Sequence, residues 1–405
     1  MRRYAVTGAA TVRLAVLVIA GEIFSAIGFA SFAVVLPELS RHWHLSSAAS
    51  GWISGAYQIG YVLAVPFLVG ITDRVSSRLV YLASCLVGMI AAFGFAWGAG
   101  DVLSACLYRA LAGASLAGTF MPGLRLLTER LTGDARLRVV PYYPASFGIG
   151  VSVSFVVCGW LAGVYGWPAA FLAGAGGCFG AALLVLAATV GWPATAVAAP
   201  APEAGHPLDP RPVLSNRGVM VYVIAYGGHG WELFALRAWM LPLLVFAWSR
   251  TSDAAPGDAV AWWASAIVLT GVPASILGAE AALAFGRRRL IGWAAWGSVG
   301  FGLLLGLVAG WSFWLVIAVM AAYNVAVAAD SGALTTGVVA HAAPSQQGAS
   351  LAVHSVVGFT GGALGPVAVG MVLDLAGGVT SPLAWGLAVA AMAAGSLVAA
   401  LAVGL

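Results

Sequence analysis

The stretch PATAVAAPAPEAGHPLDPRPV, residues 193–213, lies near the middle of a chain that is otherwise apolar. It holds six of the 18 prolines, and proline both fixes φ and removes a backbone hydrogen-bond donor. The segment is therefore predicted to be a loose polar linker and not a helix. It divides the chain into a first half, 1–192, and a second half, 214–405, and we expect each half to form one bundle of helices.

On both sides of the linker the composition is that of a membrane protein. Hydrophobic residues make up 61% of the 405 residues and charged residues only 8%, whereas a soluble domain carries about 25% charged residues. So few charges cannot cover a soluble surface, which excludes a water-soluble enzyme and a nucleic-acid-binding protein. The four cysteines lie in apolar runs without CxxC spacing, so they are predicted to be packing residues, and we expect neither a metal nor a cofactor.

Twelve apolar runs are long enough to cross a bilayer as helices, which need about 20 residues each. Six precede the linker and six follow it, which predicts an all-α integral membrane protein. The predicted spans are residues 12–37, 47–71, 79–99, 102–128, 140–165, 168–192, 217–247, 258–283, 290–309, 311–340, 347–375 and 381–404.

The arginines fix the expected orientation of these spans. With the N-terminus inside, fourteen arginines fall on the cytoplasmic side and only Arg41 and Arg250 on the outer side. All basic residues are arginine, which is typical of a GC-rich genome. The positive-inside rule then predicts a multi-pass protein of a bacterial inner membrane with both termini in the cytoplasm.

Two motifs lie near the predicted cytoplasmic ends of the early spans. The loop after the second span reads Gly70-Ile-Thr-Asp73-Arg74-Val-Ser-Ser-Arg78, and the fourth span contains Arg109-Ala-Leu-Ala-Gly113. With the arrangement of six spans, linker and six spans, these motifs resemble the major facilitator superfamily of transporters. The loop departs from the family signature, because its first Gly is one position late and its second Gly is replaced by Ser. The resemblance implies two pseudo-symmetric six-helix bundles.

The charges around the first motif are predicted to form a cytoplasmic gate. A carboxylate at Asp73 can pair with Arg78 or Arg130 and with a neighbouring helix N-terminus. Such a cluster would hold the cytoplasmic ends of the two halves together when the site faces outward. The alternative is a solvated loop that only obeys the positive-inside rule. The predicted gate residues are Asp73, Arg74, Arg78, Glu129 and Arg130.

Few ionisable side chains fall within the predicted spans. Each costs about 2.5–3.5 kcal/mol to insert, so such residues usually face a cavity and mark function. The resemblance implies that spans 1, 4, 7 and 10 line the central cavity, and all of these residues except His354 lie on those spans. The alternative for each is a structural role, such as an ion pair of Glu232 with Arg109 or Arg237. The predicted substrate and proton site consists of Glu22, Arg109, Tyr226, His229, Glu232, Arg237, Asp330 and His354.

Three of the carboxylates are candidate proton carriers. Burial at low dielectric disfavours the charged form of a carboxylate, so it can bind and release a proton near neutral pH. Glu22, Glu232 and Asp330 are the candidates, and Glu232 is the first choice because it lies mid-span beside three glycines. Tyr226, His229 and Glu232 follow each other at intervals of three and are predicted to share one helix face.

The eleventh span is predicted to be a flexing gate helix. Gly361, Gly365 and Pro366 combine close helix approach with a kink, although plain glycine-rich packing is an equal alternative.

The sequence as a whole predicts a monomeric secondary active transporter that is not an enzyme. We expect it to take up a small polar or charged organic solute with protons by alternating access. A proton-antiport exporter of drugs or metabolites is the main alternative. A metal importer is disfavoured because no His or Met pair occurs at i, i+4 in a span, and a non-transporting sensor because the intramembrane charges are kept. Neither a catalytic constellation nor a phosphate-binding loop occurs in the chain.

Overall fold

The computed structural model describes residues 8–72, 74–131, 133–139, 142–191, 210–255 and 257–404. Within these ranges all regular secondary structure is helical, which confirms the predicted all-α membrane protein. Eleven helical segments of the described residues are long and apolar enough to cross a membrane, and α3 (Ser47–Ile71) adds a helix of 25 residues. These segments correspond one to one with the twelve predicted spans.

The described helices belong to two compact units. Unit 1 contains Met1–Ser31 and Gly60–Ala201, and unit 2 contains Phe32–Ile59 and Pro202–Leu405. Residues 32–59 come from the first half of the sequence, yet they pack with helices of the second half.

Most of the predicted linker, residues 193–209, lies outside the described residues. Its last three residues differ from expectation because they begin a short helix, α9 (Arg211–Ser215). Pro212 lies in the first turn of α9, where the N–H that proline lacks would have no partner within the helix.

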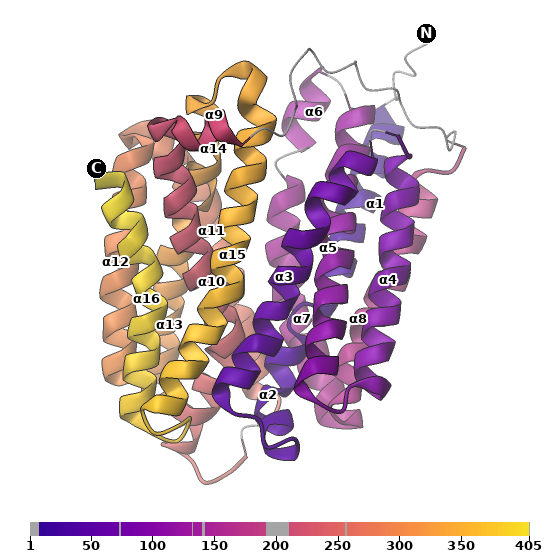
Figure 1. Ribbon diagram of the computed structural model, residues 1–405. Coiled ribbons are helices and arrows are strands. Elements are labelled where there is room, and N and C mark those ends of the chain that lie inside the picture. Colours follow the sequence, from indigo (N-terminus) through magenta and orange to yellow (C-terminus); the bar gives the residue numbers. More distant parts are fainter. Residues whose placement is uncertain are drawn as a thin grey trace. The chain divides into compact units, whose positions relative to one another are not determined.

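Unit 1 is a bundle of long helices (Figure 1), and glycines lie at several of the contacts between them. Three of the four cysteines, Cys85, Cys158 and Cys178, are buried in it and free, as expected for packing residues. Its elements are α1 (Gly8–Ser25), the 3-10 helix η1 (Ala26–Gly28), the second part of α3, α4 (Ser77–Gly98), α5 (Val102–Arg130), α6 (Gly133–Val139), α7 (Tyr142–Tyr165) and α8 (Pro168–Ala188).

The first span is broken, although the sequence predicts a continuous helix over 12–37. The α-helix ends at Ser25, and η1 and a turn follow it. The hydroxyl of Ser154 on α7 donates a hydrogen bond to the carbonyl of Ile27 and accepts one from the N–H of Ala30 at 2.9 Å. A side chain from another helix therefore pairs the backbone groups that the break sets free, as burial in a membrane requires.

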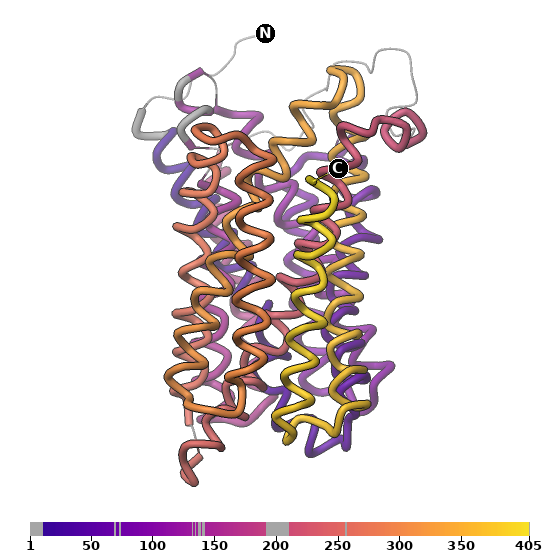
Figure 2. The backbone as a smooth tube through the Cα atoms, turned by 90° about the vertical axis from the view of Figure 1, so that its left-hand side faces the viewer, coloured from indigo at the N-terminus to yellow at the C-terminus, as the bar shows by residue number. Residues whose placement is uncertain are grey.

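Unit 2 holds the remaining helices, and α11, α12 and α13 run side by side in it (Figure 2). Its elements are α2 (Ser31–His42), the first part of α3, α9, α10 (Arg217–Ser249), α11 (Ala259–Phe285), α12 (Arg287–Val308), α13 (Phe313–Ala329), α14 (Ser331–His341), the 3-10 helix η2 (Pro344–Gln346), α15 (Gln347–Leu375) and α16 (Pro382–Gly404).

The tenth predicted span is also interrupted. Its helix ends at Ala329 and restarts at Ser331, so Asp330 stands at the junction of α13 and α14. The break leaves the Asp330 side chain at the N-terminal end of α14, where a helix dipole favours negative charge.

Candidate functional site

A buried histidine–aspartate pair forms the centre of the candidate site in unit 2. Nδ1 of His229 on α10 lies 2.8 Å from Oδ1 of Asp330 at the α13–α14 junction. Only 4% of His229 and 3% of Asp330 are exposed. The contact is an ion pair when His229 carries a proton on both ring nitrogens, so the charge of the pair depends on one proton.

An aromatic stack connects this pair to a second histidine. The ring of Tyr226 lies nearly parallel to that of His354 on α15, with 3.8 Å between centroids, and to that of His229, with 5.6 Å between centroids. His354 is buried, and its Nε2 lies 3.4 Å from the hydroxyl of Thr335 on α14. The structure thus brings four of the predicted site residues together from three segments of unit 2.

Glycines allow this close arrangement of α10 and α15. A Cβ at Gly358 would meet the ring of Tyr226, and a Cβ at Gly361 would meet the carbonyl of Gly227. One turn further along, a Cβ at Gly365 would meet the carbonyl of Trp231. Two residues of the predicted gate helix, Gly361 and Gly365, therefore lie at a backbone-to-backbone contact with α10.

The third predicted gate residue, Pro366, lies within α15, which continues as one helix to Leu375. Because proline has no N–H and its ring displaces the preceding turn, nearby carbonyls lose their usual partners. The carbonyl of Pro366 itself accepts a hydrogen bond of 3.0 Å from the indole Nε1 of Trp239 on α10.

Glu232 lies apart from Tyr226 and His229, although these three residues are predicted to share one face of α10. The hydroxyl of Tyr323 on α13 donates to its Oε1 at 2.6 Å, and the hydroxyl of Ser396 on α16 donates to its Oε2. Each step of three residues falls about 60° short of a full turn, so Glu232 lies about 120° around the helix from Tyr226. The described partners of Glu232 are hydroxyls and not the arginines that the sequence offered as alternatives. Arg237, further along α10, is half-buried.

Unit 1 contains the other two predicted site residues, at separate positions. Glu22 on α1 is fully buried, and its Oε2 accepts hydrogen bonds from the hydroxyls of Tyr143 at 2.8 Å and Ser25 at 3.4 Å. Arg109 on α5 is also buried, and its Nη2 donates to the carbonyl of Phe29 at 3.5 Å. Arg109 thus contacts the broken part of the first span.

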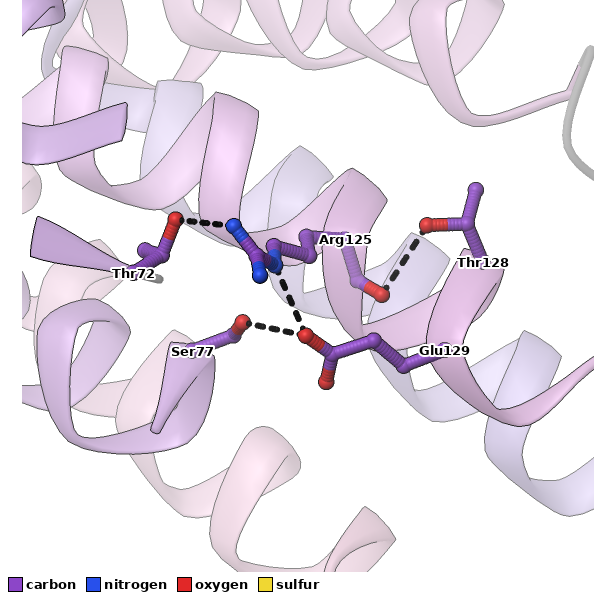
Figure 3. A network of polar contacts seen from close by, with 5 residues as sticks. All are labelled: Thr72, Ser77, Arg125, Thr128 and Glu129. Carbon is purple, nitrogen blue, oxygen red and sulfur yellow. Dashed lines mark hydrogen bonds and ion pairs between the residues drawn. The ribbon is translucent and has the colours of Figure 1, made fainter. Parts of the chain in front are cut away.

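Only part of the predicted cytoplasmic gate lies within the described residues. The residue at its centre was not among the predicted gate residues. Arg125 on α5 donates from Nε to Oε1 of Glu129 at 2.8 Å and from Nη1 to the hydroxyl of Thr72 at 2.7 Å. The hydroxyl of Ser77 donates to the same Glu129 oxygen at 3.1 Å (Figure 3). The i, i+4 spacing of Arg125 and Glu129 is the sequence signal that could have revealed this network.

The other predicted gate residues take no part in the contacts drawn in Figure 3. Asp73 lies outside the described residues. Arg78 donates from Nη1 to the carbonyl of Thr189 at 3.4 Å, Arg74 is exposed and Arg130 is half-buried.

Comparison with known proteins identifies the family. Residues 18–257, more than half of the chain, match the description of the Major Facilitator Superfamily. The protein belongs to the Major Facilitator Superfamily, whose members transport small solutes across membranes.

Solved structures of transporters share the fold. A bacterial homologue of the human lysosomal transporter Spinster has a TM-score of 0.76 at 16% identity, covering 98% of this chain and 96% of the other. The nucleoside transporter NupG has a TM-score of 0.71 at 17% identity, covering 98% of each chain. The xylose transporter XylE from E. coli has a TM-score of 0.71 at 14% identity, covering 97% of each chain. These likenesses confirm the resemblance stated from the sequence.

A curated relative matches part of the chain. The niacin transporter NiaP of Acinetobacter baylyi is 27% identical over 154 residues, which is 38% of this chain. The match spans only 35% of the length of that relative.

Proposed function

We propose that the protein is a secondary active transporter that takes up a small polar or charged organic solute together with protons by alternating access. The observation that carries this proposal is the buried pair of His229 and Asp330, with 2.8 Å between Nδ1 and Oδ1. Ionisable groups at this depth are costly and are kept mainly where they serve transport or proton transfer.

The pair has the chemistry that coupling requires. A coupling group must be charged in one conformation and neutral in another, so that the proton and the conformation depend on each other. The charge of the contact between His229 and Asp330 depends on one proton, and the contact links α10 to the α13–α14 junction. Tyr226 carries this change to His354 on α15, because its ring stacks on both histidines.

The contacts favour this pair over Glu232 as the proton carrier. Both oxygens of Glu232 accept hydrogen bonds from hydroxyls of neighbouring helices, so it has the partners of a structural group. Glu22 likewise accepts from two hydroxyls inside unit 1. Arg109 and Arg237 remain proposed contributors to substrate binding.

The orientation, the gate and the oligomeric state complete the proposal. We propose that the protein is a monomer in a bacterial inner membrane, with both termini in the cytoplasm. We also propose that the part of the chain before the linker and the part after it each move as one body. The network of Arg125, Glu129, Thr72 and Ser77 supports a polar cluster at the cytoplasmic end of α5. Asp73, Arg74, Arg78 and Arg130 are proposed to extend it.

The first test identifies a substrate and the coupled ion. The purified protein is screened by thermal shift against small organic acids, bases and zwitterions at two pH values, beginning with niacin because a relative bears that name. A hit is then followed in proteoliposomes with and without an inward proton gradient. Accumulation above equilibrium only with the gradient supports the proposal. Accumulation driven by an outward proton gradient would establish proton antiport, as in an exporter, and no response to pH would refute proton coupling.

The second test concerns the pair itself. Asp330→Asn keeps the size of the side chain and removes its charge, so we expect gradient-driven uptake to fall by at least tenfold. Exchange of labelled for unlabelled substrate without a gradient should persist, because exchange need not release the proton. Thr335→Ala is the matched control, since it alters a hydroxyl beside His354 and leaves the pair unchanged. Normal gradient-driven uptake by Asp330→Asn would refute the assignment.

A further inference from the structure

Three consecutive arginines begin α12 without an acidic partner. The turn between α11 and α12 is the single residue Gly286, whose φ is +93°, so Arg287, Arg288 and Arg289 all fall in the first turn of α12. Arg288 and Arg289 are exposed. Nε of Arg287 donates a hydrogen bond of 3.3 Å to the uncharged hydroxyl of Thr336 on α14. Among the described residues, none of the three arginines forms an ion pair with a carboxylate.

This placement of positive charge is unfavourable for α12 by itself. The N-terminal end of a helix carries a partial positive charge and attracts anions. α12 has no acidic residue in its first turn, and the side chain of its N-cap residue, Gly286, supplies no acceptor for the first N–H groups. The nearest acidic residue along the sequence, Glu280, is exposed on α11 and takes part in none of the described ion pairs. An anion beside the three arginines would therefore be attracted by all of their charges at once.

Beyond the arginines, one face of α12 is apolar and exposed along the length of the helix. At 100° per residue, the residues 4, 7, 11, 14 and 18 positions after Arg289 lie within about 40° of it around the helix. All five are exposed, and we call them the α12 stripe: Trp293, Trp296, Gly300, Leu303 and Leu307. A Cβ at Gly300 would have nothing within 4 Å, so the stripe is open to a neighbouring molecule at that point.

Aromatic rings lie where the α12 stripe meets the arginines. Trp293, one turn after Arg289, packs against Phe285, the last residue of α11, with 5.7 Å between the ring centroids. Tryptophan is enriched in membrane proteins at the level of the lipid headgroups. The arginines, one turn beyond Trp293, therefore lie at the depth of the lipid phosphates, and the stripe beyond Trp296 lies at the depth of the acyl chains.

We propose that the three arginines at the start of α12 and the α12 stripe bind one anionic phospholipid, with its phosphate against the arginines and its acyl chains along the stripe. Arginine suits this role because its planar group of donors matches the oxygens of a phosphate. The proposed orientation places this turn on the cytoplasmic side, where basic clusters of membrane proteins bind anionic headgroups. The site shares no residue with the candidate substrate and proton site.

The test compares two lipids that differ in the charge of the headgroup. Phosphatidylglycerol or phosphatidylcholine with identical acyl chains is titrated into the purified protein in detergent, and bound lipid is counted by native mass spectrometry. We expect the wild type to bind the first phosphatidylglycerol more tightly than the first phosphatidylcholine. Arg288→Gln combined with Arg289→Gln should reduce this preference by about 25-fold, because one arginine near an anionic membrane surface contributes about fivefold. The two side chains have no described partner inside the protein, so the double variant should fold.

The matched control is Arg211→Gln combined with Arg217→Gln. It also removes two exposed arginines, at the first positions of α9 and α10, but no tryptophan follows either of them within two turns. The control should leave the preference for phosphatidylglycerol unchanged. Arg288→Lys combined with Arg289→Lys keeps both charges and should retain most of the preference.

Two results would overturn the proposal directly. One is an unchanged preference in the Arg288→Gln, Arg289→Gln protein while that protein still elutes as one species. The other is an equal loss of preference in the control, which would show that the effect follows from net charge and not from this site.

The stripe and the source of the phosphate are tested separately. Trp293→Ala combined with Trp296→Ala should weaken the binding of both lipids by a similar factor, because the rings contact the part of the lipid below the headgroup. Unchanged binding in this variant, together with displacement of phosphatidylglycerol by millimolar inorganic phosphate, would indicate a site for a soluble anion and refute the lipid. These measurements need neither substrate nor a proton gradient, so a failure of proton coupling and a failure of the lipid site give different results.

Discussion

The hydroxyl of Tyr323 and Oε1 of Glu232 are 2.6 Å apart, within a bundle interior where neither residue reaches solvent. The second oxygen of Glu232 accepts from Ser396, so the carboxyl group links α10 to both α13 and α16. A group held in this way resists displacement, because any rotation of α10 breaks two buried hydrogen bonds at once.

Glu232→Gln distinguishes this structural role from proton coupling. The amide keeps an oxygen that accepts from Tyr323. We therefore expect gradient-driven uptake in proteoliposomes to remain within about twofold of wild type, which is a smaller change than the loss of one neutral hydrogen bond would cause. If uptake against a gradient disappears while exchange persists, Glu232 carries the coupled proton, as the sequence alone indicated.

Tyr323→Phe tests the stability of the same contact. The change leaves Glu232 Oε1 buried without its donor, which costs about 1–3 kcal/mol. Thermal unfolding in detergent should show a lower midpoint. Tyr226→Phe is the control, because it removes a hydroxyl from a half-buried tyrosine of unit 2 and keeps the ring that stacks on His354. Equal midpoints for the two variants would contradict the prediction.

The hydrogen bonds of Asp101 at the start of α5 should make the stability of the folded protein depend on pH. The backbone N–H and then the hydroxyl of Ser104 donate to its carboxylate and lower its pKa below the usual value. A lowered pKa in the folded state means that the cap stabilises the fold above the unfolded pKa, about 4, and that this stability is lost as the pH falls through the folded value. The unfolding midpoint of Asp101→Asn should lie below that of wild type at pH 7, and the difference should shrink as the pH falls below the unfolded pKa. A difference that grows in acid would contradict the assignment.

Cysteine labelling tests the proposed orientation. A cysteine at Gly205, in the predicted linker, should react only with reagents that reach the cytoplasm. A cysteine at Ala254, between α10 and α11, should react with impermeant reagents from outside. Labelling of both positions from the same side would contradict the division into two halves of six spans.

The sequence predicted the helices well because lipid imposes a simple rule on it. A run of about 20 apolar residues must be a helix, so the spans and the observed elements agree within a few residues. The break after Ser25 was missed because it depends on Ser154, which lies far along the chain on α7. A tertiary partner of this kind leaves no trace in a local hydrophobic pattern.

The sequence predicted which types of residue form the candidate site, but it predicted their arrangement in space less well. Buried ionisable residues are rare, so His229, Asp330 and His354 stood out from composition alone. The hydroxyl groups beside the buried ionisable residues, such as Thr335 beside His354 and Ser396 beside Glu232, are common in apolar helices and carried no signal. Three residues of a helix fall about 60° short of a full turn, so His229 and Glu232 point in different directions from α10. They therefore contact different neighbouring helices.

Asp374, near the end of α15, accepts hydrogen bonds of 2.8 Å from the N–H groups of Ser47 and Ala48 at the start of α3, and this cap has a consequence for biogenesis. The ribosome completes Ser47 and Ala48 long before it reaches Asp374, which comes 327 residues after Ser47. At about 5–20 residues per second, roughly 16–65 s pass before the carboxylate exists. During that interval the start of the second span must keep its two N–H groups hydrated at the membrane surface. The cap of α3 is therefore completed only after the eleventh span has been made, so chains that end before Asp374 should leave these two N–H groups without this partner.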